Sequence, residues 1–314
     1  MPIIQSSVAD VTAEADRPKY FARIMATYGL GFVLGPALSA ALPRHLATKN
    51  KLAVASLFPL IGFVIQLVFF KGTKLNITPL GAGSSKVGSK SDAPAVMSTK
   101  AAPVNPRVLL LLLNGFLLMY AFSIETIYAM FIKDSFAYGK RELSTLFACN
   151  GVLIGIFQVF FIKPLVARIG KHWTLIVGNA LLATGMVGLA LIRNKPIHFA
   201  LFVLHIVGYS IADTALASLI SKYSSASSQG RDLAFNQAAQ ASARVISPLI
   251  AGLLYEASKS PSSVLPVGAL PYLTGAVFPA IGTLVPFILY GQSVTRKKRQ
   301  LASDLAFEAG VDSH

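Results

Sequence analysis

Eight apolar segments, each about as long as a bilayer is thick, constrain this sequence more than any other feature. They cover approximately residues 20–42, 52–70, 108–132, 143–162, 173–192, 199–220, 234–255 and 268–290. A helix needs about 20 mostly apolar residues to cross the hydrocarbon core, where its backbone polar groups must bond to one another. We therefore predict an all-α, polytopic membrane protein with eight transmembrane helices.

The composition agrees with residence in a lipid bilayer. Hydrophobic residues make up 54% of the 314 residues and charged residues 13%, whereas a soluble protein carries about 25% charged residues. In a membrane protein, a net charge of +15 indicates basic cytoplasmic loops, not nucleic-acid binding. The lone Cys149 can form neither an internal disulfide nor a zinc site, so we expect no metal or cofactor. The acidic N-terminus (Asp10, Glu14, Asp16) does not resemble a signal peptide.

The distribution of Lys and Arg predicts the orientation. With a cytoplasmic N-terminus, 18 of the 28 basic residues fall in cytoplasmic loops and 9 in the opposite loops. Such a bias predicts that both termini are cytoplasmic. Residues 71–107, rich in Gly, Ser, Lys, Ala and Pro, are typical of a disordered linker on the same side. The predicted domains are therefore residues 1–70, the linker 71–107, a helical bundle at 108–292 and a cytoplasmic tail at 293–314.

A pattern of small residues and proline occurs twice, 212 residues apart. The first copy contains Gly31, Gly35 and Pro36, and the second contains Ser247 and Pro248. Small residues at this spacing let helices approach closely in lipid, and an intramembrane proline bends a helix. Each copy precedes a polar loop and one last apolar segment, which indicates a duplicated unit of six helices. On this reading residues 1–70 keep only the last two helices of the first unit, and 108–292 form a complete second unit.

Four stretches resemble the major facilitator superfamily, in the branch of tetracycline-resistance-type drug:proton antiporters and their eukaryotic relatives. They are residues 10–17, 29–36, 125–151 and 163–171. Residues 29–36 resemble the antiporter motif of the family's fifth helix. The resemblance implies a helical bundle of this family without its first four helices, and alternating access by rocking of two halves about a midplane site.

The basic loop 163–171 matches the family's loop signature at Arg168 and Gly170, which we expect to be structural. It has Ala167 where the family has an aspartate before the arginine, and Ser39 and Ala40 replace two glycines of the antiporter motif.

Charged residues within transmembrane segments are functional candidates, because each costs about 2.5–3.5 kcal/mol to insert. The resemblance implies that the third, fourth, sixth and seventh segments line a central cavity, and polar residues recur along them at helical spacing. The candidates for substrate or ion coupling are Glu125, Asp213, Arg244, His205, Tyr209, Gln237, Gln240, Asn114, Asn150 and Gln158.

Structural roles for these side chains stay open. Arg244 can be a cation neutralised by Asp213 or Glu125, and similar estimated depths favour Asp213 as its partner. Glu125 can be solvated near the outer interface, and His205 can be a plain contact between helices. Asn150 and Gln158 can provide interhelical hydrogen bonds.

We expect a secondary active transporter of a small organic solute or drug-like molecule in the plasma membrane or an endomembrane. Coupling to protons is expected because a carboxylate in a low-dielectric site binds a proton more readily than one in water. The competing hypothesis is a truncated, non-transporting protein, either a gene-model fragment or a regulatory partner of a full-length carrier. It follows from the partial first repeat, and on it the chain alone does not catalyse uptake. No catalytic motif supports an enzyme.

The predicted orientation can be tested with single cysteines at Ser89 and Ser303 in a Cys149→Ser background. We expect both to resist an impermeant thiol reagent in intact cells and to react after permeabilisation. Labelling of either residue from outside would refute the charge-based topology.

Overall fold

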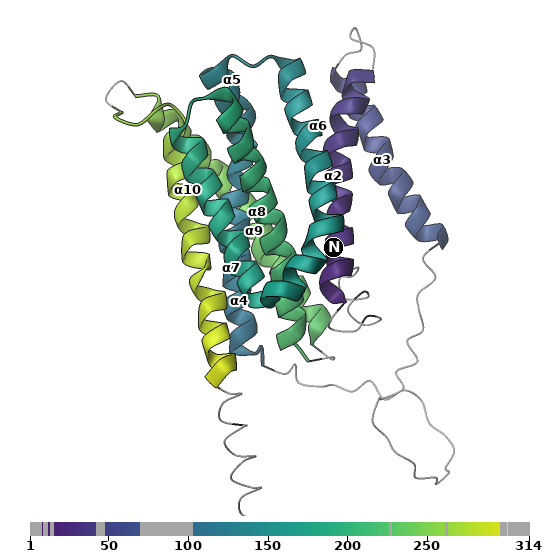
Figure 1. Ribbon diagram of the computed structural model, residues 1–314. Coiled ribbons are helices and arrows are strands. Elements are labelled where there is room, and N and C mark those ends of the chain that lie inside the picture. The colour runs from purple at the N-terminus through teal and green to yellow at the C-terminus, as the bar shows by residue number, and fades with distance from the viewer. Residues whose placement is uncertain are drawn as a thin grey trace, which may run out of the picture. The chain divides into compact units, whose positions relative to one another are not determined.

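The computed structural model describes residues 8, 12, 16–41, 48–69, 103–225, 228–260, 263–295 and 300, whose regular elements are all helices (Figure 1). Most of the predicted linker, and the predicted tail from residue 296 apart from residue 300, lie outside these residues. The chain divides into two compact units. One contains Met1–Ala37 with Pro103–His314, and the other contains Leu38–Ala102.

The helices follow the predicted apolar segments with small shifts at their ends. The larger unit holds most of α2 (Arg17–Ala41), then α4 (Pro106–Ser123), the 3-10 turn η1 (Ile124–Ile127), α5 (Tyr128–Phe136), α6 (Lys140–Ile156), the π-helical turn η2 (Phe157–Phe161), α7 (Ile162–Leu191), α8 (Lys195–Tyr223), α9 (Gln229–Ser258), α10 (Ala269–Gly282) and a helical stretch at 284–295. The smaller unit contains α3 (Thr48–Phe69).

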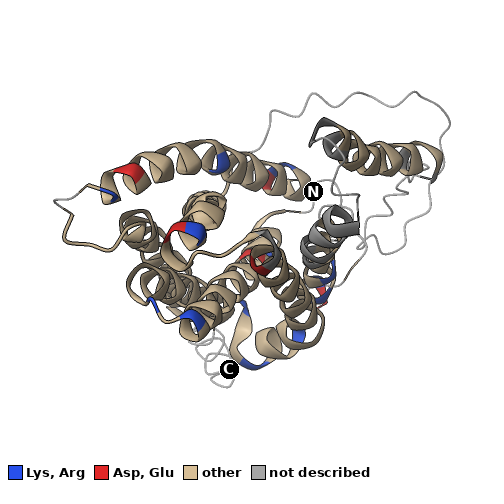
Figure 2. Ribbon diagram, turned by 90° about the horizontal axis from the view of Figure 1, so that it is seen from above, with Lys and Arg blue, Asp and Glu red and all other residues tan. Residues whose placement is uncertain are grey.

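Among the described residues, four helical runs are long and apolar enough to cross a membrane. They are Pro106–Phe136, Glu142–Leu191, Lys195–Tyr223 and Ala269–Thr295, and Ala53–Ile65 is a shorter apolar helix. Charged positions, coloured in Figure 2, occupy only small parts of the ribbons. The predicted all-α membrane fold is therefore confirmed.

The second of these runs joins two predicted segments and bends between them. Gly170 has φ 79° and ψ 162°, outside the helical region. Glycine adopts this positive φ without the steric cost of a Cβ atom. The predicted structural role of Gly170 thus has a physical basis, because it ends one helical axis and starts another.

The closest backbone approach described in the larger unit joins α7 and α8. A Cβ atom added to Gly178 would lie 2.6 Å from the Ala212 amide nitrogen, and one added to Gly208 would lie 2.5 Å from that of Leu182. Small residues therefore let these helices pack nearly backbone to backbone, as in other membrane bundles. The sequence pattern placed such packing at Gly31 and Gly35, where an added Cβ would meet no described atom within 4 Å.

The second copy of the pattern does lie at a helix interface. Ala243, Ser247 and Ala251 are buried along α9. The Ser247 hydroxyl donates to the backbone carbonyl of Tyr120 on α4 at 2.7 Å. This bond fastens α9 to α4 one residue before Pro248, inside an otherwise regular helix.

The N-terminal part of α2 packs on the bundle. Phe21 and Ala22 are 1% exposed. Arg17 Nη1 donates to the Ser221 hydroxyl at 2.7 Å, and Asp16 lies 3.4 Å from Lys163 Nζ. These contacts group the start of α2 with α7 and α8, whereas the sequence analysis grouped α2 with α3 in residues 1–70.

A proline in the last helix determines the partner of Asn114. Pro286 has no N–H, so it cannot bond to the carbonyl four residues earlier, which belongs to Gly282. Asn114 Nδ2 on α4 donates to that carbonyl at 2.5 Å, and the Asn114 side chain is fully buried. Asn114, a predicted coupling residue, thus compensates a break in α10.

This role predicts a specific rescue. Asn114→Leu should lower the thermal stability of the purified protein in detergent, because a buried carbonyl without a donor costs about 1–3 kcal/mol. Pro286→Ala restores an N–H for the same carbonyl, so Asn114→Leu should cost less in that background. Asn150 donates to Leu146 of its own helix, and Pro286→Ala should not rescue Asn150→Leu. Equal effects of Asn114→Leu in both backgrounds would contradict this assignment.

Candidate functional site

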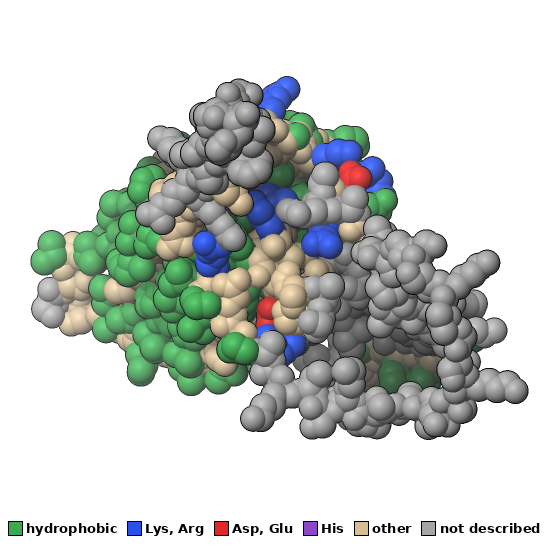
Figure 3. Space-filling view, turned by 90° about the horizontal axis from the view of Figure 1, so that it is seen from below, with side chains coloured by type: hydrophobic (Ala, Val, Ile, Leu, Met, Phe, Trp, Pro, Cys, Tyr) green, Lys and Arg blue, Asp and Glu red, His purple; other side chains and the backbone are tan. Residues whose placement is uncertain are grey.

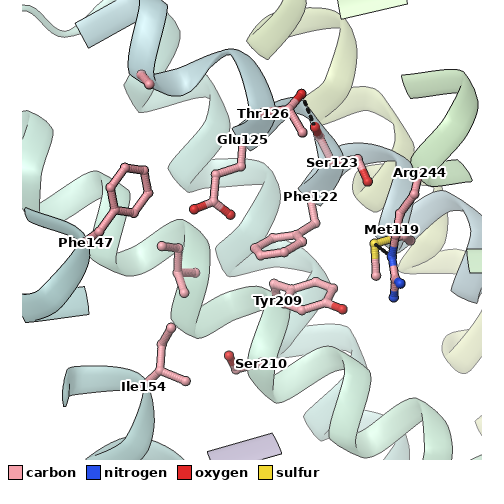
Figure 4. A pocket seen from close by; sticks show the side chains of 12 residues that line it. Met119, Phe122, Ser123, Glu125, Thr126, Phe147, Ile154, Tyr209, Ser210 and Arg244 are labelled. Atoms are coloured by element: carbon pink, nitrogen blue, oxygen red, sulfur yellow. Dashed lines mark hydrogen bonds between the residues drawn. The ribbon is translucent and has the colours of Figure 1, made fainter. Parts of the chain in front are cut away.

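A cavity of about 540 Å³ lies within the larger unit (Figure 4). Its walls come from the α4–η1–α5 run, α6, α8 and α9. These are the same four segments that the resemblance implies for the lining of a central cavity. The lining residues are Met119, Phe122, Ser123, Glu125, Thr126, Ala129, Phe147, Ile154, Ile206, Tyr209, Ser210 and Arg244.

Glu125 is the carboxylate of this cavity, and a break in regular helix geometry presents it. It lies in η1, where four residues of 3-10 helix separate α4 from α5. In Figure 4 its carboxylate points into the space between the Phe122 and Phe147 rings. Oε1 is buried and has no hydrogen-bond partner in the described protein. A buried polar atom in this state requires a ligand, a water or a proton to offset its desolvation.

Two aromatic rings form a flat surface beside Glu125. Phe122 and Tyr209 stack with their centroids 3.8 Å apart and an interplanar angle of 12°. Phe122 also stacks on His205 at 5.8 Å. Stacked rings of this kind can take a further planar group at the offset distances that aromatic pairs prefer. The cavity therefore combines an apolar, aromatic wall with a single carboxylate.

Arg244 contributes the positive charge of the cavity from α9. Its Nε lies 3.3 Å from the Met119 sulfur. In Figure 4 the guanidinium stands on the other side of Phe122 from the Glu125 carboxylate. A thioether is a weak acceptor, and a guanidinium carries five N–H donors. Arg244 thus keeps donors for an anionic or carbonyl group of a ligand.

The structure does not join Arg244 to Asp213 in an ion pair, although their charges attract each other. Asp213 Oδ1 accepts a hydrogen bond from Gln240 Nε2 at 2.8 Å. Asp213 is 4% exposed, whereas Arg244 is exposed. Gln240 lies one turn before Arg244 on α9, and it is Gln240 that bonds to Asp213 on α8. The sequence analysis paired Asp213 with Arg244 because the two have similar depths in the membrane. Depth gives a position along the helix axis and does not show which face of α9 points to α8.

The remaining candidates do not line this cavity. Gln158 Nε2 donates to the Ser210 carbonyl at 3.2 Å, and Asn150 to Leu146 at 2.9 Å. His205 is 1% exposed, and neither ring nitrogen has a described partner. Gln237 is half-buried. Of the ten candidates, Glu125, Tyr209 and Arg244 line the cavity.

The sequence analysis missed the apolar walls. Met119, Phe122, Phe147, Ile154 and Ile206 contribute side chains to the cavity. In an apolar helix these residues have the same pattern as those that face lipid or core. Small polar residues on the same segments could have indicated the cavity-facing sides of these helices: Ser123, Thr126 and Ser210 all line the cavity.

The separate roles of Asp213 and Arg244 can be tested with two double-mutant cycles of thermal stability. Asp213→Asn and Arg244→Gln should couple only weakly, because their charges attract each other without a hydrogen bond or ion pair between the two side chains. Asp213→Ala and Gln240→Ala should be non-additive, because each removes the same hydrogen bond. Restoration of stability in the Asp213→Asn/Arg244→Gln double mutant would instead indicate an ion pair.

Comparison with known proteins gives a consistent result. Residues 111–309 match the family described as Major Facilitator Superfamily. The class G tetracycline resistance protein of Vibrio anguillarum is 27% identical over 240 residues, which are 73% of this chain and 56% of that protein. The class B protein of Escherichia coli is 22% identical over 265 residues, 82% of this chain and 62% of that protein. This chain therefore spans little more than half the length of these relatives.

A human relative and a solved human structure are also similar. Solute carrier family 67 member A1 is 24% identical over an alignment of 315 positions, which covers 95% of this chain and 68% of that protein. The crystal structure of the human organic anion transporter MFSD10 (TETRAN) matches with a TM-score of 0.67 and 18% identity. The match covers 91% of this chain and 67% of that one, and at this identity it shows a common fold.

Proposed function

Because this chain belongs to the major facilitator superfamily, we propose that its cavity binds a small organic solute and serves secondary active transport. The chain is an integral membrane protein of a family of transporters, not of enzymes. The bilayer and a small-molecule substrate are its partners. Transport proceeds by alternating access, in which two helical bundles rock about a site near the bilayer midplane.

The observation that carries the proposal is the cavity with an unpartnered carboxylate in it. Its volume is within the range of about 300–1,000 Å³ that is common for small-molecule sites. The Phe122–Tyr209 stack holds a planar apolar group. Glu125 and Arg244, on either side of Phe122, orient the polar groups of the solute.

Glu125 is the proposed coupling residue for protons. An unpaired carboxylate in a membrane site is costly, and such residues commonly form proton relays. It alternates between a protonated state and a charged state that pairs with a cationic group of the solute. The same site then holds either the proton or the solute charge, which couples the two movements.

The proposed orientation places the start of α4 and the end of α8 in the cytoplasm. Figure 3 views the molecule from the end where α4 begins and shows several basic patches with little acidic surface. This agrees with the charge count, which places both termini on that side. The turns at Ala137–Gly139 and Ile192–Asn194 then face the opposite side of the plasma membrane or endomembrane.

Tetracycline is a suitable probe because it is planar and relatives of this chain confer resistance to it. We expect the purified chain in nanodiscs to bind it saturably and to lose binding on Ala129→Leu, which fills the cavity. Ala180→Leu is the matched control, since Ala180 is exposed on α7. Equal binding by both variants would refute the cavity as the site. Uptake into liposomes with an acidic lumen then distinguishes a carrier from a protein that only binds.

A further inference from the structure

An open depression lies at the rim of the larger unit, near the ends of α5 and α9. It has a volume of about 440 Å³ and is lined by Asp134, Ser135, Arg193, Lys259 and Val267. The Asp134 side chain is 42% exposed, and Lys259 Nζ lies 3.8 Å from its carboxylate. By the proposed orientation this rim faces away from the cytoplasm.

Tyr255 connects this rim to the interior. Its hydroxyl donates to Asp134 Oδ2 at 2.7 Å, while the residue as a whole is 1% exposed. Gly268 packs against Tyr255 and Phe131, and its backbone N–H bonds to Ser258 at 2.7 Å. The tyrosine is thus held between a solvated carboxylate and the aromatic core.

Two further tyrosine hydroxyls lie deeper. Tyr272 on α10 is 1% exposed and Tyr128 on α5 is fully buried. Both rings pack near Phe131, with centroids 5.3 Å (Tyr272) and 6.1 Å (Tyr128) from its ring. Neither hydroxyl has a hydrogen-bond partner in the described protein. Tyrosine hydroxyls normally find partners when buried, so both need an explanation.

The row of hydroxyls leads to Glu125. Ile124 packs directly against Gly275, which is three residues after Tyr272 on α10. Glu125 lies in the 3-10 turn three residues before Tyr128, and side chains three residues apart in such a turn lie on the same face. Buried Oε1 of Glu125 is a third polar atom without a partner. Water bridges are the least costly way to satisfy such a group of atoms, since a buried water makes two to four hydrogen bonds.

We propose that Asp134, Tyr255, Tyr272 and Tyr128 form a hydrated proton path between the outer rim and Glu125. This inference rests on the proposed proton coupling and assigns its access route. One proton enters at the Asp134 carboxylate and one reaches the Glu125 carboxylate. Each hydroxyl or water accepts one proton and passes one on, so none of them changes its charge overall. A protonated Asp134 becomes a donor to Tyr255, which then turns its own hydrogen inward.

Several charged and titratable groups face the path. Arg193 lies 4.8 Å above the Phe131 ring and donates to the carbonyls of Leu189 and Val267 at 3.0 Å. Lys259 bonds to Glu256 at 2.9 Å. His198 packs on Phe131 with centroids 5.4 Å apart. The fixed cation of Arg193 at the mouth opposes entry of other cations, while protons pass by exchange along hydrogen bonds.

The test uses Tyr272→Phe and Tyr128→Phe in the full chain, each of which removes one oxygen atom. Vesicles are enriched for one orientation through an affinity tag, and the pH on the outer side is changed rapidly. The infrared band of the Glu125 carboxyl, assigned with Glu125→Gln, reports proton arrival. Tyr120→Phe is the control, because the Tyr120 ring stacks on Phe278 at 4.0 Å and is outside the path.

Each path variant should slow protonation of Glu125 roughly tenfold, which is the effect of one lost hydrogen-bonding step, and Tyr120→Phe should not. Unchanged rates in both path variants, or equal slowing in the control, would overturn the path. Tetracycline binding is measured on the same samples. If the unmodified chain shows normal proton arrival at Glu125 but does not bind tetracycline, the result counts against the proposed function and leaves the path intact.

Discussion

The absence of water from the lipid hydrocarbon governs this protein, because backbone polar groups that cross it must bond within the protein. The backbone meets this requirement by being helical. Where a proline removes a backbone donor, as Pro286 does, a side chain from another helix replaces it. The Ser247 hydroxyl uses the Tyr120 carbonyl in the same way to fasten α9 to α4. Interhelical bonds of this kind join α4 to α9 and to α10.

Buried polar atoms without partners among the described residues are then informative where several lie together. Glu125 Oε1 and the hydroxyls of Tyr128 and Tyr272 lie in one region, along η1, α5 and α10. Asn179 is fully buried beside Gly282, and neither of its amide atoms has a partner in the described protein. A packed membrane protein retains such groups where something else binds them, whether water, protons or solute.

Much of the fold was readable from the sequence, because long apolar runs and intramembrane charges have few structural alternatives. The helices, the four segments around the cavity and the presence of Glu125 and Arg244 in its lining follow from those patterns. Contacts that depend on rotation about a helix axis did not. Asp213 meets Gln240 because of the face that α9 turns toward α8. The aromatic wall at Phe122 could not be separated from lipid-facing residues by hydropathy.

The four-residue 3-10 turn at Glu125 has a consequence for the register of the helix that follows it. A 3-10 helix advances about 120° per residue and an α-helix about 100°, so four residues accumulate about 80° of extra winding. That offset determines which side of α5 faces the aromatic core, where Tyr128 and Phe131 are buried. The buried face of α5 therefore cannot be found by continuing the helical repeat of α4 across the turn. Rewinding η1 to an α-helical pitch would turn Tyr128 and Phe131 together about the helix axis, with no change in any loop.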